Sequence, residues 1–312
     1  MVRNIRSPYP VSVVVTSRLI RTAGLAAAVV AAQACVVSMD HEGSIERLDK
    51  RFTVDKIADL HLYSFDGNIE VRSWDKPEVL VQIEKRGQDK DVVSKIEVLT
   101  EQKDNRIQVE ARYSGKTGFI GFGIYHSPSA RMIASVPRNV NLTIRTSDGA
   151  VVVERVNGHT EIKTSDGSIR ASEISGELVA ETSDGSIQID DVSGRIEART
   201  GDGSIRLSGT PSVLRARSGD GSIVLRIRNG ATMADDWMVA TGDGSVTVEL
   251  PDGFNAEIEA EPSSDGRVRN DLTLINPTGG TRESRTLKGR LGEGGKRLTL
   301  RTGDGTIRLT NY

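Results

Sequence analysis

Five aspartates recur at a constant spacing in the middle of the chain, and their carboxylates are the most obvious groups for binding a cation. Each is followed by glycine, and each lies eighteen residues after the previous one: Asp148, Asp166, Asp184, Asp202 and Asp220. If the repeats stack as β-strands, these carboxylates lie about 4.8 Å apart, and a bound calcium ion would relieve their repulsion. One interpretation of the repeat is therefore a cation ladder.

A structural turn is the alternative interpretation of the same Asp-Gly pairs. Calcium takes about 6–8 oxygen ligands, and the nine-residue Gly-Gly-x-Gly-x-Asp repeat of calcium-binding solenoids does not occur in the sequence. In a turn, aspartate accepts hydrogen bonds from nearby backbone N–H groups and glycine takes a positive φ. Lys163, Arg199 and Arg217 each stand three residues before an aspartate and would partly compensate its charge. We expect the turn, with no firm metal site and no cofactor.

Cys35 is the only cysteine in the chain, and it follows an arginine-bearing, apolar segment. The apolar stretch 23–34 is shorter than the roughly 20 residues of a membrane-spanning helix, so it is typical of an export signal. Ala32-Gln33-Ala34 is a small-x-small cleavage site. Cys35 is either the lipidated first residue of a lipoprotein, although the usual lipobox has leucine where Ala32 stands, or an incidental residue after simple cleavage.

Catalysis and nucleic-acid binding are both disfavoured by the sequence. Paired acids on a β-helix could cleave a polysaccharide, but an eighteen-residue repeat leaves about two to four residues for each corner, too few to build a cleft. The four histidines are scattered along the chain. The formal net charge is -2, whereas binding to phosphate backbones requires a basic surface. We therefore expect no enzymatic activity and no nucleic-acid partner.

Short strands are the elements that position the aspartates. Three and five residues after each aspartate stands an apolar pair, such as Ile169 and Ala171, and the residue between its members is often polar. A second such pair, such as Leu178 and Ala180, stands twelve and fourteen residues after the aspartate, and a threonine such as Thr182 stands sixteen residues after it at a further inward-facing position. This alternation predicts strands with one buried face, which stacking of successive repeats would bury in continuous columns. The sequence predicts an all-β, single-stranded β-solenoid of about eighteen residues per coil; a β-sandwich is the alternative, but it does not require a constant step.

The whole chain divides into four predicted parts. Residues 1–34 are the signal peptide, 35–50 a linker after the lipid anchor, 51–145 a smaller β-rich cap region, and 146–312 the solenoid. The cap region contains alternating strand patterns such as "NIEVRSW" and "NRIQVEARY", interrupted by the glycine-rich loop "SGKTGFIGFGIYHSP". A cap is needed because the last coil of a solenoid would otherwise expose unpaired strand groups.

The repeated "TSDGSI…VSG" units, the segment "VATGDGSVTVELPDGFNAEIEAEPSSDGRV" and the ending "GEGGKRLTLRTGDGTIRL" resemble a known bacterial family. It is the β-strand-repeat domain of unknown function that carries the label "putative adhesin", and the resemblance covers roughly residues 50–312. The resemblance implies a solenoid-like β domain in the cell envelope, and some members are tied to envelope stress signalling. It supplies no catalytic residue.

These observations together predict a non-catalytic envelope module that acts in adhesion, as a scaffold or in envelope stress. Its partner would be an envelope protein or a surface polymer, and a lipid on Cys35 would attach it to the membrane. Because Val36 rather than an acidic retention residue follows Cys35, we expect an outer-membrane lipoprotein; a periplasmic or secreted soluble protein is the alternative. Self-association and cation binding are alternative activities, and a polysaccharide-active enzyme is a more distant one.

Overall fold

The computed structural model describes residues 43–115, 127–263, 265–279 and 283–312. Within these ranges the chain forms 24 strands and one five-residue helix, α1 (Lys90–Ser94), so the all-β prediction is confirmed. The described ranges belong to one compact unit. The predicted signal peptide, Cys35 and most of the glycine-rich loop lie outside the described residues.

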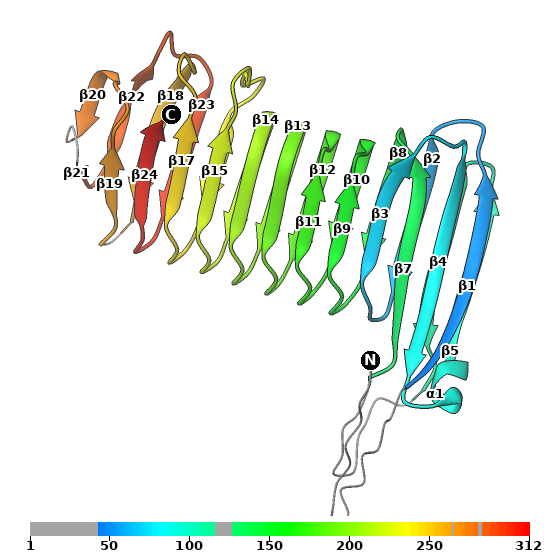
Figure 1. Cartoon of the computed structure of the whole chain (residues 1–312). Coiled ribbons are helices and arrows are strands. Elements are labelled where there is room, and N and C mark those ends of the chain that lie inside the picture. The colour runs from blue at the N-terminus through cyan, green and yellow to red at the C-terminus, as the bar shows by residue number, and fades with distance from the viewer. Residues whose placement is uncertain (1–42, 116–126, 264, 280–282) are drawn as a thin grey trace, which may run out of the picture. The chain divides into compact units, whose positions relative to one another are not determined.

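The strands are stacked in two layers, with the apolar side chains between them (Figure 1). In spatial order, layer A contains β5 (Ile96–Lys103), β6 (Arg106–Tyr113), β2 (Ala58–Ser64), β8 (Val140–Arg145), β10 (Asn157–Lys163), β12 (Ser175–Thr182), the second halves of β13 (Ile187–Thr200) and β14 (Ile205–Ser218), β16 (Trp237–Ala240), β23 (Arg297–Thr302), β18 (Ala256–Pro262), β22 (Leu287–Leu291) and β20 (Ile275–Gly279). Layer B contains β1 (Ser44–Thr53), β4 (Glu78–Gly87), β7 (Ser129–Pro137), β3 (Ile69–Trp74), β9 (Val151–Glu154), β11 (Ile169–Ser172), the first halves of β13 and β14, β15 (Ile223–Ile227), β17 (Val246–Leu250), β24 (Thr306–Asn311), β19 (Arg267–Asn270) and β21 (Glu283–Ser284).

Parallel pairing in the repeat follows the spacing of the sequence. Ile169 of β11 pairs with Val151 on one side and with Ile187 on the other, each eighteen residues away, and Ile187 pairs with Ile205. Each of these side chains is at most 1% exposed. Like residues therefore lie on like residues, and the predicted inward columns are confirmed.

The same stacking extends beyond the regular repeat toward the N-terminus. β2 lies between β6 and β8, and β3 lies between β7 and β9, all in parallel pairs. Antiparallel strands β1, β4 and β5 then complete this end. β1 begins at Ser44, inside the stretch expected to be a linker. Its sequence did not reveal it because nearly all its side chains are exposed or half-buried, so it lacks a strong apolar alternation.

Near the C-terminus, the coils stack in an order that differs from their order in the sequence. β24 inserts between β17 and β19, and β23 inserts between β16 and β18. The final coil of the chain is thus clamped between two earlier ones. This is physically possible because every coil offers the same parallel edge, so any two coils with matching corners can be neighbours.

Candidate functional site

The five predicted aspartates lie at a corner where the chain passes from layer A to layer B. All five are exposed, and the glycine after each one packs directly on the backbone of the glycine in the preceding coil. A Cβ on Gly185, for example, would approach the carbonyl oxygen of Gly167 well inside 3.0 Å. These glycines do not take the predicted positive φ; positive φ occurs at the opposite corner, as at Gly158, Gly176 and Gly194. Close stacking, rather than φ, is therefore the reason for glycine at the Asp-Gly corner.

Threonine, not aspartate, accepts the local backbone hydrogen bond at this corner. Thr182 accepts from the N–H of Gly185 at 3.2 Å, and its Oγ1 also lies 2.9 Å from Ser165 O and 3.1 Å from Gly167 O in the coil below. Thr164, Thr200, Ser218 and Thr302 make the same bond to the glycine three residues later. The turn interpretation gave this role to the carboxylate. At the corners of the regular repeat the threonine or serine hydroxyl has this role, whereas at the Asp66 corner the carboxylate accepts from the N–H of Gly67. The sequence predicted that these threonines face inward, but it did not predict their hydrogen bonds.

An additional aspartate, Asp66, belongs to the same column although it is 82 residues from Asp148. Asn68 accepts from the N–H of Ala150 at 3.0 Å, and a Cβ on Gly149 would clash with Gly67 O, so the two corners are stacked. Burial of Asp66, together with the nearby charge of Asp148, raises the pKa of Asp66 above its ordinary value. The motif Asp66-Gly67-Asn68-Ile69 is the signal in the sequence that marks this coil.

Two of the three basic residues expected to compensate the aspartates contact glutamates instead, and the third, Arg217, forms no ion pair with a described residue. Lys163 Nζ lies 3.1 Å from carboxylate oxygens of both Glu161 and Glu181, and Arg199 binds Glu181 and Glu197. These contacts lie on the outer surface of layer A, and Asp184 lines the same shallow hollow as Lys163, Glu181 and Arg199. In the described part of the chain, no three His, Cys, Asp or Glu side chains converge in a way that could hold a metal ion.

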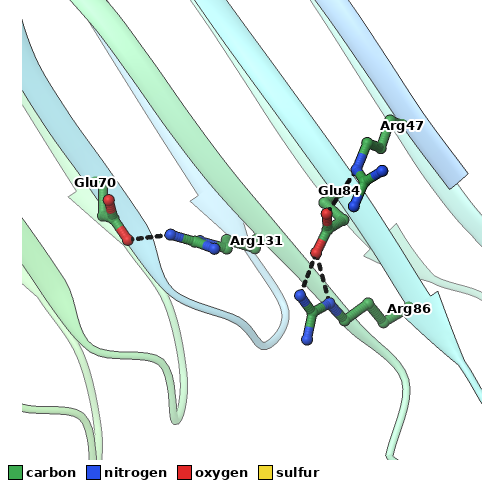
Figure 2. A network of polar contacts seen from close by, with 5 residues as sticks. All are labelled: Arg47, Glu70, Glu84, Arg86 and Arg131. Atoms are coloured by element: carbon green, nitrogen blue, oxygen red, sulfur yellow. Dashed lines mark hydrogen bonds and ion pairs between the residues drawn. The ribbon is translucent and has the colours of Figure 1, made fainter. Parts of the chain in front are cut away.

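A row of alternating charges crosses the outer surface of layer B near the N-terminal end of the stack (Figure 2). Glu84 of β4 accepts hydrogen bonds from Arg47 of β1 at 2.8 Å and from Arg86 at 2.6 Å. Arg131 of β7 is opposite Glu84 in register and donates to Glu70 of β3 at 2.6 Å. Each carboxylate has a basic partner, so the row joins four strands.

This row gives the stability of the protein a specific pH dependence. Hydrogen bonds from Arg47 and then Arg86 lower the pKa of Glu84 below its ordinary value of 4.5. A lowered pKa means that the stabilisation is present above the unfolded-state value and is lost as the pH falls through the folded-state value. We expect Glu84→Gln to cost about 0.5–1 kcal/mol at pH 7 and progressively less below about pH 4.5, since the wild-type carboxylate then becomes neutral as well.

Urea unfolding of wild type and Glu84→Gln at pH 7 and at about pH 3.5 measures this difference. Glu101→Gln is the matched control, because exposed Glu101 makes no ion pair with another described residue. A wild-type-to-Glu84→Gln difference that stays constant or grows on acidification would contradict the prediction.

The outer surface of layer A is hollowed where β14, β16, β23 and β18 lie side by side. Arg215, Met238, Thr299 and Glu259 follow one another across these strands in register, and Arg217, Ala240, Arg301 and Glu261 form the next row. The short side chains of Ala240 and Thr299 lie between longer ones, and Thr299 is only 8% exposed although it points outward. The resulting cavity, which we call the arginine hollow, has a volume of about 570 Å³. It is lined by Ala198, Arg199, Arg215, Ala216, Arg217, Asp236, Trp237, Met238, Ala240, Glu259, Arg297, Thr299 and Arg301.

The positive charge of the arginine hollow is only partly neutralised. Arg297 lies 3.6 Å from Glu259, and Arg199 is bound by two glutamates. Arg215 and Arg217 are exposed and form no ion pair with any other residue that the structure describes. Glu197 is opposite Arg215 in register, but its carboxylate binds Arg199. Arg217 is opposite Arg199, and two like charges in that arrangement destabilise a sheet unless something else compensates them.

Sequence reasoning missed this hollow. Arg217 was noted only for its distance from Asp220. Thr299 and Arg301 belong to the segment that carries the family resemblance, but nothing in that segment points to a binding site. The hollow exists only because β23 lies between β16 and β18, which brings together residues about 60 positions apart in the chain. The only available signal was the pair of outward-facing arginines in "VLRARS".

Known families and solved structures resemble this chain in its fold. A family model described as Toastrack DUF4097 matches residues 57–310. No curated protein matches the sequence. A crystal structure from Bacteroides fragilis, described as a "putative adhesin", has a TM-score of 0.50 and 15% identity, and the match covers 85% of this chain and 97% of that one.

Two further solved structures match over a similar share of the chain, with lower TM-scores and lower sequence identities. A "putative adhesin" from Parabacteroides merdae has a TM-score of 0.47 and 11% identity, covering 85% of this chain and 96% of that one. A "putative lipid binding protein" from Parabacteroides distasonis has a TM-score of 0.42 and 12% identity, covering 84% and 96%. At these identities the likeness concerns the fold alone.

Proposed function

The chain belongs to the Toastrack DUF4097 family, and from this premise we propose that it is a non-catalytic, exported protein of the cell envelope that presents the outer surfaces of a stacked β domain to a partner. The partner is an envelope protein or a surface polymer, and the role is adhesion, scaffolding or a part in envelope stress. The observation that carries this proposal is the continuous stack itself, which holds outward side chains in fixed rows on both layers.

The proposal takes the stack to be a single-stranded β-solenoid with about eighteen residues per coil, and residues 146–312 to be its repeat domain with 51–145 as the cap. The parallel registers of β10, β12 and β13 support this coil size, since Leu178 pairs with Thr160 and with Ile196. In the same proposal the Asp-Gly column is a structural corner rather than a cation site. The stacking of its glycines and the hydrogen bonds of its threonines support that role.

End-to-end self-assembly is the less favoured alternative, because the end strands are poor templates for further pairing. β20 at one end has only exposed residues and contains Pro277, which has no N–H to donate. At the other end, β5 is exposed in most positions and carries Glu97, Glu101 and Lys103. Charged or proline-bearing edges of this kind oppose strand addition, so a lateral surface is the better candidate for partner binding.

Attachment to the membrane is assigned to a lipid on Cys35. No helix in the described ranges is long and apolar enough to cross a bilayer. Two acyl chains on an N-terminal cysteine would anchor a protein stably, because each buried CH₂ contributes about 0.8 kcal/mol. We propose the outer membrane as its location, with a periplasmic or secreted soluble form as the alternative.

Metabolic labelling with an alkyne fatty acid, followed by membrane fractionation, tests the anchor. We expect labelled protein in the membrane fraction for the wild type, and unlabelled protein that no longer sediments with membranes for Cys35→Ala. Ser38→Ala, a nearby change that leaves the cysteine in place, is the control and should behave as wild type. Labelling that survives Cys35→Ala would disprove the lipoprotein assignment, and retention of the whole chain in the cytoplasm would disprove the envelope proposal.

A further inference from the structure

We propose that the arginine hollow binds the acidic sugar units of an anionic polysaccharide. This inference deepens the proposed function by naming the chemistry of a surface-polymer partner. It rests on the proposed function only for the location, the cell envelope, where the protein would contact the polymer. Its basis is a cavity of about 570 Å³ that combines two uncompensated arginines, an apolar floor and carboxylates at the edge.

Charge is the first property of the hollow that suits an acidic sugar. Five arginines and two carboxylates line the hollow, while the whole chain has a formal net charge of -2. Arg215 and Arg217 project from the same strand two residues apart, so both guanidinium groups lie on one side of β14. A guanidinium binds a carboxylate through two parallel hydrogen bonds, and a ligand carboxylate on this pair would neutralise charge that no described glutamate or aspartate compensates.

The floor of the hollow is apolar. Met238 is 47% exposed and lies in register between Arg215 and Thr299, with Ala240 beside it in the next row. A thioether and a methyl group next to cationic groups suit a ring that is apolar on its C–H face and polar at its rim, as a sugar ring is. A small inorganic anion would leave most of the volume unfilled.

Two carboxylates lie at the edge of the hollow. Glu259 accepts from Lys288 at 2.6 Å, and this hydrogen bond lowers the pKa of Glu259, so its carboxylate stays charged. Asp236, also at the edge, accepts from the backbone N–H of Arg297 at 2.8 Å. Carboxylates accept hydrogen bonds from hydroxyl groups, which every ring of a uronic acid polymer carries and a DNA backbone lacks. The edge thus favours a glycan over DNA, and a hollow rather than a protruding apolar surface disfavours insertion into a bilayer.

Isothermal titration calorimetry with a galacturonic acid hexasaccharide tests the proposal on the purified chain. We expect binding that weakens with salt, and no binding of maltohexaose, a neutral hexasaccharide of similar size. In Arg215→Ser/Arg217→Ser the dissociation constant should rise at least about tenfold, because two charge-assisted contacts are lost. Arg170→Ser/Arg206→Ser is the matched control: it removes the same charge from the outer surface of layer B and should stay within about twofold of wild type.

The outcomes separate this proposal from its rivals and from the proposed function. Absence of uronate binding, equal weakening in both double variants, or tighter binding to phosphatidylglycerol vesicles or to single-stranded DNA than to the hexasaccharide would each overturn it. Far-UV circular dichroism confirms that the variants are folded. Since the assay uses purified protein, failure here leaves the envelope assignment standing, and failure of the labelling experiment leaves the binding result standing.

Discussion

Gly185→Ala is expected to destabilise the protein by about 3 kcal/mol or more, although it adds a single methyl group at an exposed corner. The added Cβ would lie well inside 3.0 Å from both the carbonyl oxygen and the carbonyl carbon of Gly167 in the coil below. That neighbour is backbone and cannot rotate away. It is also held in place, because Ser165 O accepts from the N–H groups of Ser183 at 2.8 Å and Asp184 at 3.1 Å. The two coils would have to separate at this corner.

Gly230→Ala is the matched control for this prediction. Gly230 has a φ of +87° and no atom within 4 Å of an added Cβ, so the substitution carries only the backbone strain, about 1–2 kcal/mol. Urea unfolding of both variants measures their free energies of unfolding. The comparison separates the cost of close packing at Gly185 from the cost of backbone strain at Gly230. If Gly185→Ala were no more destabilising than Gly230→Ala, the corner would be an ordinary turn and glycine packing would not determine the spacing of the coils.

Sequence reasoning succeeded where a structural requirement repeats at a fixed interval. The column containing Ile169, Ile187 and Ile205 is buried and paired as predicted, because each side chain meets its own equivalent one coil away. The period alone determines such contacts. The same property limits the prediction: identical coils are interchangeable as neighbours, so the period does not specify which coils are adjacent.

The insertion of β24 between β17 and β19 illustrates this limit. Asp243, Asp265 and Asp304 follow one another in the sequence, but the pairing of Val246 with Ile307 and of Ile307 with Val268 places the last of them in the middle. An antiparallel excursion, β20 to β22, intervenes and pairs along β18. The arginine hollow depends on this order, so no reading of local motifs could have assembled Met238 and Thr299 next to Arg215.

The threonine column is the feature of the corner whose role the sequence predicted least well. It was predicted to face inward, and Thr182 is buried, but an inward threonine in a stack of threonines suggests only packing. The structure shows that its Oγ1 is the acceptor for the N–H of Gly185, a backbone group with no other acceptor among the described residues. A buried N–H without an acceptor costs about 1–3 kcal/mol. The hydroxyl therefore makes the close stacking of the glycines possible.

Thr182→Val should then cost about 2–3 kcal/mol even though it preserves shape, because it leaves the Gly185 N–H unsatisfied and removes the contacts to Ser165 O and Gly167 O. Thr182→Ser is the matched control. It keeps the hydroxyl and loses one methyl group, for about 0.8 kcal/mol. Ser218 shows that serine fits this column, since its Oγ lies 2.8 Å from Gly203 O and accepts from Gly221 N–H at 3.0 Å.

Urea unfolding and amide hydrogen exchange measure the two effects together. Hydrogen exchange at Gly185 should accelerate in Thr182→Val and stay near the wild-type rate in Thr182→Ser, since only the former removes the acceptor. A valine variant as stable as the serine variant would mean that the column serves packing alone. A loss confined to valine would instead identify the hydroxyl as the group that joins successive coils at this corner.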